Sequence, residues 1–260
     1  MPAATSDLRR GQAPPTVPPT VSSGNPFSAG FRAARANLIP GLVIQALMVS
    51  LVLLYYFYPP ARSWFRTLAV AKAHWGYAFA FCSAVVAGAL LPILLKCLTL
   101  QRGRFTRANF SELLFLAIFW GCDGLIIDGF YRFQAVIFGA QADFPIVLKK
   151  VLVDQFIYNP LFAAPYTVIC FEFRNRGCHW GRMADAFTMD FYRVQIIPTL
   201  CATWAVWIPV TTAIYALPSL LQVPLFALAL SFWSLLITCI TSRPAASQTL
   251  AASLSRVVPD

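Results

Sequence analysis

The sequence predicts an all-α protein, a polytopic transmembrane helix bundle of about six spans, and three observations support this. The 260 residues are 58% hydrophobic and only 12% charged, whereas an ordinary soluble domain carries about 25% charged residues. The hydrophobic residues form runs about as long as a bilayer is thick. The basic residues collect in alternate connections between these runs, as in cytoplasmic loops. This composition excludes a disordered chain, a nucleic-acid-binding domain and a typical soluble enzyme.

Residues 1–36 are the first predicted segment, a flexible tail rich in Pro, Ser and Thr. The tail lacks the apolar region of a secretory signal. Near its end Phe27, Phe31, Ala34 and Leu38 fall on one helical face. This face indicates either a short helix lying at the membrane interface or the entry to the first span.

Residues 37–242 form the predicted transmembrane domain, and residues 243–260 form a short polar tail. About 20 residues, rising 1.5 Å each, cross a hydrocarbon core of about 30 Å. The uncharged or nearly uncharged runs that meet this length are 38–58, 76–95, 110–130, 151–171, 194–217 and 220–241.

The last two predicted spans come from one uncharged run, 194–242, which is too long for a single crossing. Leu217-Pro218-Ser219 is the expected break, because proline ends helices and serine favours turns. Six spans place both termini and the 96–109 and 172–193 loops on one side, together with most of the 20 Lys and Arg residues. A five-span arrangement stays open.

Small residues recur at helical spacing in two of the predicted spans. Ala80, Ala84 and Gly88 form a small-xxx-small stripe, and Gly121 and Gly124 lie in the following span. Such stripes allow the backbones of two helices to approach closely. We interpret them as packing positions.

Acidic side chains at membrane depth are costly and need a polar environment. Asp123 lies near the middle of its span, so we expect it to face a partner, a water-filled cavity or the bundle interior. Asp128 is five residues further on and points to a different side of the helix. The two carboxylates are therefore not expected to form a catalytic site in which one acts as the acid and the other as the base.

Two acid–base pairs are predicted from spacing along the helices. Asp128 and Arg132 are four residues apart, as are Lys150 and Asp154, and Gln155 adjoins the second pair. Residues at this spacing share a helix face. The pairs either fix helix register and partner choice or form the polar lining of a pore.

The sequence offers no catalytic or metal-binding pattern, so we expect neither an enzyme nor a cofactor. The chain has two histidines, His74 and His179, and no GxSxG, HExxH or phosphate-binding loop motif. Cys170, Cys178 and His179 fit no common metal-ligand spacing, so no metal site is predicted.

Three stretches resemble the Mpv/PMP family of small peroxisomal and mitochondrial inner-membrane proteins. Residues 124–132 resemble its Gly-Pro-x-x-x-Gly-Trp-Tyr-Lys segment, with Leu125 in place of the proline. Lys150, Asp154, Gln155 and Pro160 resemble its Lys-x-x-x-Asp-Gln…Pro signature. The order Trp204, Trp207, Pro218, Trp233 is similar to its closing tryptophan pattern. The resemblance covers about residues 74–241.

The resemblance implies a channel-like pore of weak selectivity for small solutes, or a role in organelle and membrane homeostasis. As a pore, the protein would use a polar face of six residues whose paired charges keep the lumen nearly neutral: Asp123, Asp128, Arg132, Lys150, Asp154 and Gln155. The alternative is a non-conducting membrane scaffold. The expected partners are the lipid bilayer and small solutes, with no nucleic acid; an oligomer stays open. The expected location is the plasma membrane in a bacterium and a mitochondrial or peroxisomal membrane in a eukaryote.

Overall fold

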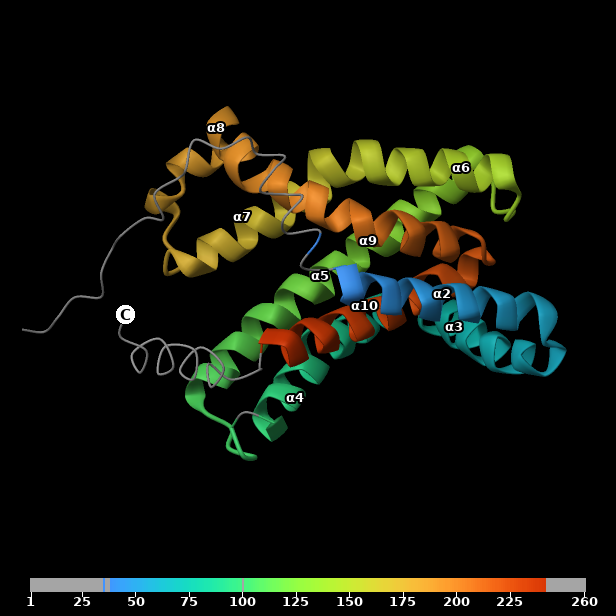
Figure 1. Ribbon diagram of the computed structural model, residues 1–260, viewed down its shortest axis with the longest axis horizontal. Helices are drawn as coiled ribbons and strands as arrows, with labels where there is room; N and C mark the ends of the chain where they lie inside the picture. The colour runs from blue at the N-terminus through green and yellow to red at the C-terminus, as the bar shows by residue number, and fades with distance from the viewer. Residues whose placement is uncertain (1–34, 36–37, 100, 242–260) are drawn as a thin grey trace, which may run out of the picture.

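The computed structural model describes residue 35, residues 38–99 and residues 101–241, and these residues contain helices and no strand (Figure 1). The all-α prediction is therefore confirmed for this part of the chain. Apart from Arg35, the two predicted tails lie outside the described residues.

Nine α-helices and six shorter or wider helical segments make up the described chain. The α-helices are α2 (Leu38–Phe57), α3 (Arg62–Val85), α4 (Leu91–Thr99), α5 (Arg107–Phe138), α6 (Phe144–Val153), α7 (Ala164–Asn175), α8 (Met189–Phe191), α9 (Ile197–Tyr215) and α10 (Ser219–Thr241). The other segments are η1 (Pro59–Ala61), η2 (Val86–Leu90), η3 (Asp154–Ala163), η4 (Trp180–Arg182), η5 (Ala184–Phe187) and η6 (Tyr192–Ile196).

In the described chain these elements join end to end into six helical rods, which we define as α2, η1–α4, α5, α6–α7, α8–α9 and α10. Successive rods run in opposite directions along the long axis of the molecule (Figure 1). Each rod contains one of the six apolar runs predicted from the sequence. The break expected at Leu217-Pro218-Ser219 is confirmed, since α9 ends at Tyr215 and α10 begins at Ser219.

The second rod begins well before the predicted start at Gly76. It runs from Pro59 to Thr99 and bends at Gly76. The φ angle of Gly76 is 52°, a positive value that glycine adopts more readily than other residues. The Nζ atom of Lys72 donates a hydrogen bond of 2.9 Å to the Gly76 carbonyl at this bend. The predicted boundary was wrong because it treated Lys72 as a residue that ends a span, whereas Lys72 is buried within the rod.

Two continuous helices in the described chain are long and apolar enough to cross a membrane, Pro59–Thr99 and Arg107–Phe138. A third candidate is the pair Met189–Cys201 and Thr203–Tyr215, which meet at 51°. Gly41–Phe57 and Ser219–Leu235 are apolar but shorter. Two or three helices therefore have the properties of spans by length and composition.

The helices pack through the small residues singled out in the sequence. α3 packs against both α5 and α10, while α2 and α6 both lie against α9. At the α3–α5 contact Ala80 and Ala84 are buried, and a Cβ atom built on Gly124 would lie 2.6 Å from the Ala80 carbonyl oxygen. This close approach confirms the packing interpretation of the small-residue stripe.

Apolar side chains cover much of the outer surface, while five charged side chains among the residues described are buried. Val136 is 85% exposed, and Ile39, Phe57 and Leu161 are also largely exposed. The charged residues buried inside the described chain are Lys72, Asp123, Asp128, Lys150 and Asp154. In a soluble domain charged side chains are almost never fully buried unless they are paired.

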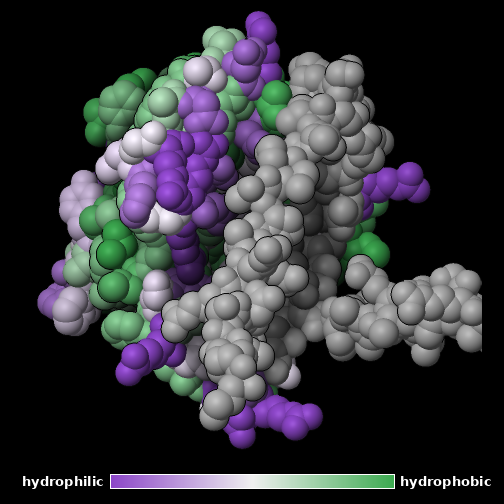
Figure 2. Space-filling view, turned by 90° about the vertical axis from the view of Figure 1, so that its left-hand side faces the viewer, coloured by the Kyte–Doolittle hydropathy of each residue, from purple (hydrophilic) through white to green (hydrophobic). Residues whose placement is uncertain are grey.

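Basic side chains gather at one end of the bundle, where α4 meets α5 and where α7 leads to α8. Figure 2 views this end and shows hydrophilic side chains running down it beside apolar ones. The exposed basic residues of these two connections are Arg102, Arg104, Arg107, Arg182 and Arg193. The structure therefore places the 96–109 and 172–193 loops at the same end, as the sequence predicted.

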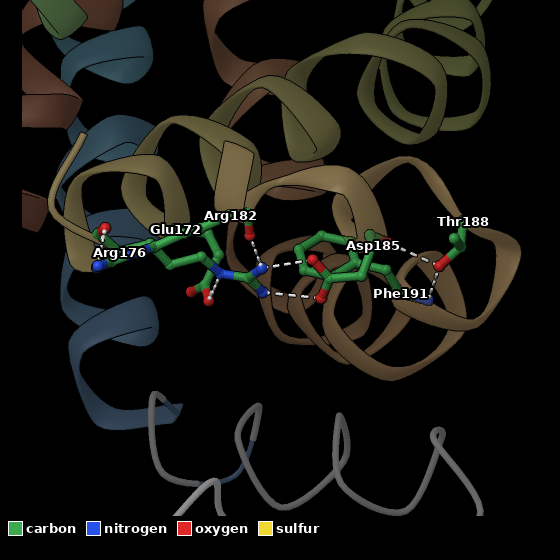
Figure 3. Close-up of polar contacts among 6 residues, drawn as sticks. All are labelled: Glu172, Arg176, Arg182, Asp185, Thr188 and Phe191. Atoms are coloured by element: carbon green, nitrogen blue, oxygen red, sulfur yellow. Dashed lines mark hydrogen bonds and ion pairs between the residues drawn. The ribbon is translucent and has the colours of Figure 1, made fainter. Parts of the chain in front are cut away.

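An arginine-centred cluster holds the connection from α7 to α8 (Figure 3). The Nε atom of Arg176 donates to Glu172 at 2.7 Å, and its two terminal nitrogens donate to the Asp185 carboxylate. Nη1 of Arg176 also donates to the Arg182 carbonyl. Thr188 caps the following short helix by accepting from the Phe191 amide at 3.2 Å. These contacts fold the loop back onto the end of α7.

We expect this loop to loosen in acid. The hydrogen bond from Arg176 lowers the pKa of the Asp185 carboxyl below its ordinary value of 3.8. The stabilisation is therefore present above pH 3.8 and is lost as the pH falls through the lower, folded value. In a ¹³C NMR titration, the Asp185 carboxyl should titrate below pH 3.8. It should return to the ordinary value in Arg176→Gln, and an unchanged titration in that variant would contradict the ion pair.

Candidate functional site

A cavity of about 180 Å³ lies among α5, η3, α7, α9 and α10. Its polar lining comes from two carboxylates, two carboxamides and four threonine hydroxyls: Asp123, Asp154, Gln155, Asn159, Thr167, Thr199, Thr203 and Thr211. Aromatic side chains supply much of the remaining wall: Trp120, Tyr131, Tyr158, Trp207, Phe226 and Trp233. A cavity of this polarity and size has room for water or a small solute.

Asp154 is held by neutral hydrogen-bond donors at the start of η3. The Tyr215 hydroxyl donates to its Oδ2 atom at 2.6 Å, and the Gln155 Nε2 atom donates to its Oδ1 atom at 2.9 Å. The same Nε2 atom lies 3.3 Å from the Thr211 hydroxyl. The carboxylate is thus oriented by hydrogen bonds, while its charge has no cationic partner among the described residues.

Asp123 is the second acidic group of the cavity. It is 8% exposed, and within the described chain it forms no hydrogen bond and no ion pair. The sequence required this residue to meet a partner, the bundle interior or a cavity. The structure places it at the cavity wall.

A π-helical stretch with an internal proline shapes the wall opposite α9. η3 contains Pro160, which has no N–H to donate to the carbonyl of Gln155 five residues earlier. The Trp204 indole donates to that carbonyl at 2.8 Å, and the Tyr192 hydroxyl donates to the Pro160 carbonyl at 3.0 Å. Side chains from the α8–α9 rod therefore satisfy the wide turn and fix it beside the cavity.

The predicted pair of Lys150 and Asp154 does not form. Lys150 is 1% exposed, and its Nζ atom lies 5.8 Å from the centroid of the Tyr215 ring without a hydrogen-bond partner among the described residues. Asp154 is already occupied by Tyr215 and Gln155. The prediction was wrong because helix spacing cannot reveal a competing donor from α9, 61 residues away.

The predicted pair of Asp128 and Arg132 is confirmed, with a distance of 3.1 Å from Arg132 Nε to Asp128 Oδ1. A residue that the sequence analysis missed joins it: Lys72 donates to Asp128 Oδ2 at 2.6 Å. The Arg132 guanidinium also lies over the Tyr77 ring at 4.7 Å. One buried carboxylate thus links α3 to α5 through two cations.

The six residues predicted to form one polar face are divided between two places. Asp123, Asp154 and Gln155 line the cavity, whereas Asp128, Arg132 and Lys150 do not. The described lining of this cavity therefore contains no pair of opposite charges. Its described charged residues are acidic only.

The sequence analysis also missed the contribution of α9. Five residues recur there at every fourth position: Thr199, Thr203, Trp207, Thr211 and Tyr215. All but Tyr215 line the cavity, and Tyr215 donates to Asp154. A search for polar and aromatic residues at helical spacing would have found this stripe.

Within the described residues, no group of three or more His, Cys, Asp or Glu side chains is arranged to hold a metal ion. Comparisons of the chain with protein-family models, curated proteins and solved structures find no match. Membership of the Mpv/PMP family stays a prediction.

Proposed function

We propose that this chain is an integral membrane protein whose six rods span the bilayer and whose cavity passes small solutes. Exposed apolar side chains such as Val136 and Leu161, together with buried charges, support a lipid environment. Six rods that reverse direction, with basic loops gathered at one end, support the six-span topology. The resemblance to the Mpv/PMP family points the same way.

The observation that carries the solute path is the pair of buried carboxylates facing one cavity. To carry its charge, an acidic group at this depth without a cationic partner needs water or a polar solute beside it. Asp123 has neither ion pair nor hydrogen bond within the described chain, and Asp154 is met only by neutral donors.

The scaffold is nevertheless supported by a different observation. Lys72, Asp128 and Arg132 are close-paired and lie outside the cavity lining, so their contacts serve to join α3 to α5. We assign this cluster a structural role within the bundle. The solute path and the structural link can be tested separately, because the first is tested at Asp154 and the second at Asp128.

Efflux of a small neutral solute from liposomes containing the purified chain tests the solute path. We expect Asp154→Asn to slow efflux about tenfold, because the uncharged side chain weakens a charge-assisted hydrogen bond worth about 1.5–3 kcal/mol and lowers the hydration of the cavity. Asp143→Asn removes the same charge at an exposed loop position and should leave efflux unchanged. Wild-type vesicles that stay tight would favour the scaffold.

A further inference from the structure

We propose that the cavity binds a small organic cation, an ammonium or quaternary ammonium group on a compact carbon skeleton. This cation would be the solute that passes through the cavity, and that part of the proposal rests on the proposed function. Binding itself can be measured without transport. Three properties of the cavity carry the inference.

The first property is charge. Two carboxylates, Asp123 and Asp154, line the cavity, and its described lining contains no lysine, arginine or histidine. Lys72 and Arg132 contact Asp128, and Lys150, whose Nζ atom lies 5.8 Å from the centroid of the Tyr215 ring, is outside the cavity lining. A positively charged solute would therefore meet complementary charge, while an anion would meet repulsion.

The second property is an unsatisfied acceptor. Asp123 is more than nine-tenths buried, lines the cavity and has no partner within the described chain. The buried hydroxyl of Tyr158, which also lines the cavity, lacks a hydrogen-bond partner among the described residues. A buried polar group without a partner is unfavourable, so these two atoms mark where a ligand or its bound water would sit.

The third property is the aromatic wall, which distinguishes an organic cation from a metal ion. Trp120, Trp207 and Trp233 line the cavity together with Tyr158. Aromatic faces attract ammonium and quaternary ammonium groups, and the quaternary groups shed water more readily because they have no N–H donors. A volume of about 180 Å³ is smaller than the 300–1,000 Å³ typical of drug-sized ligands. The ligand is therefore a compact one.

Titration of the full-length chain in detergent with choline, followed by tryptophan fluorescence and calorimetry, tests the proposal. The matched ligand is 3,3-dimethylbutan-1-ol, which has the shape of choline without its charge. We expect saturable binding of choline and at least about tenfold weaker binding of the alcohol. Equal affinities, or no saturable choline binding, would overturn the proposal.

Variants locate the site. Asp123→Asn should weaken choline binding about tenfold, while Asp123→Glu should keep most of the affinity because it keeps the charge. Asp143→Asn is the charge-matched control and should bind like the wild type. Unchanged choline affinity in a folded Asp123→Asn variant would place binding elsewhere. If that variant does not fold, the comparison of choline with its neutral isostere on the unmodified chain still decides.

Flux measurements separate this proposal from the proposed function. Liposomes containing the chain are tested with labelled choline, the neutral alcohol and a small anion. Choline binding without any flux contradicts the pore and leaves the cation site intact. Flux of all three solutes at similar rates supports the pore and overturns the cation preference.

Discussion

Asp128→Asn is expected to destabilise the folded protein by about 3–5 kcal/mol, the range found when one partner of a buried ion pair is removed. The loss is large because the Lys72 side chain is 4% exposed and has Asp128, at 2.6 Å, as its only carboxylate partner in the described chain. Its Nζ atom also donates to the Gly76 carbonyl and lies 6.0 Å from the centroid of the Tyr77 ring. The protein is unfolded in mixed micelles by raising the fraction of a denaturing detergent, and the midpoint of unfolding is compared between the variant and the wild type.

Arg132→Gln is the matched control for this prediction. The Arg132 side chain is 52% exposed, so its pair with Asp128 is worth about 1 kcal/mol or less. The double variant Lys72→Met, Asp128→Leu removes both buried charges and should recover most of the lost stability. If Asp128→Asn unfolds no more readily than Arg132→Gln, the buried pair does not hold α3 to α5.

The helical rods were predictable from the sequence because their signal is local. Uncharged runs, proline and glycine positions and the Leu217-Pro218-Ser219 break report on short stretches of chain. The small residues Ala80, Ala84 and Gly124 also carried a readable signal, since close helix contact requires small side chains. The Asp128–Arg132 pair succeeded for the same reason, because both partners lie on one helix.

The cavity was only partly predictable because its decisive contacts join distant residues. Lys72 was assigned to a loop, since no local signal shows that Asp128, 56 residues later, neutralises it inside the bundle. Lys150 was assigned to Asp154 by spacing, although Tyr215 had already engaged that carboxylate. A charged residue in a sequence therefore marks a polar environment more reliably than it identifies its partner.

Gly124→Ala is expected to destabilise the bundle by about 1–3 kcal/mol, the range for overpacking a close contact. The added Cβ atom would lie 2.6 Å from both the Ala80 carbonyl oxygen and the Ala84 Cβ atom. The first of these is backbone, so α3 and α5 must move apart. Separation also weakens the van der Waals packing that holds helices together in lipid.

Gly129→Ala is the internal control, five residues later on the same helix. Its added Cβ atom would meet nothing within 4 Å, so alanine should stabilise α5 by up to about 1 kcal/mol through helix propensity alone. The two variants share that propensity gain and differ in the contact with α3, and unfolding midpoints in mixed micelles should therefore shift in opposite directions. Equal shifts would mean that α3 and α5 do not approach each other closely at Gly124, and the rod that positions Asp123 would then have to be held by other contacts.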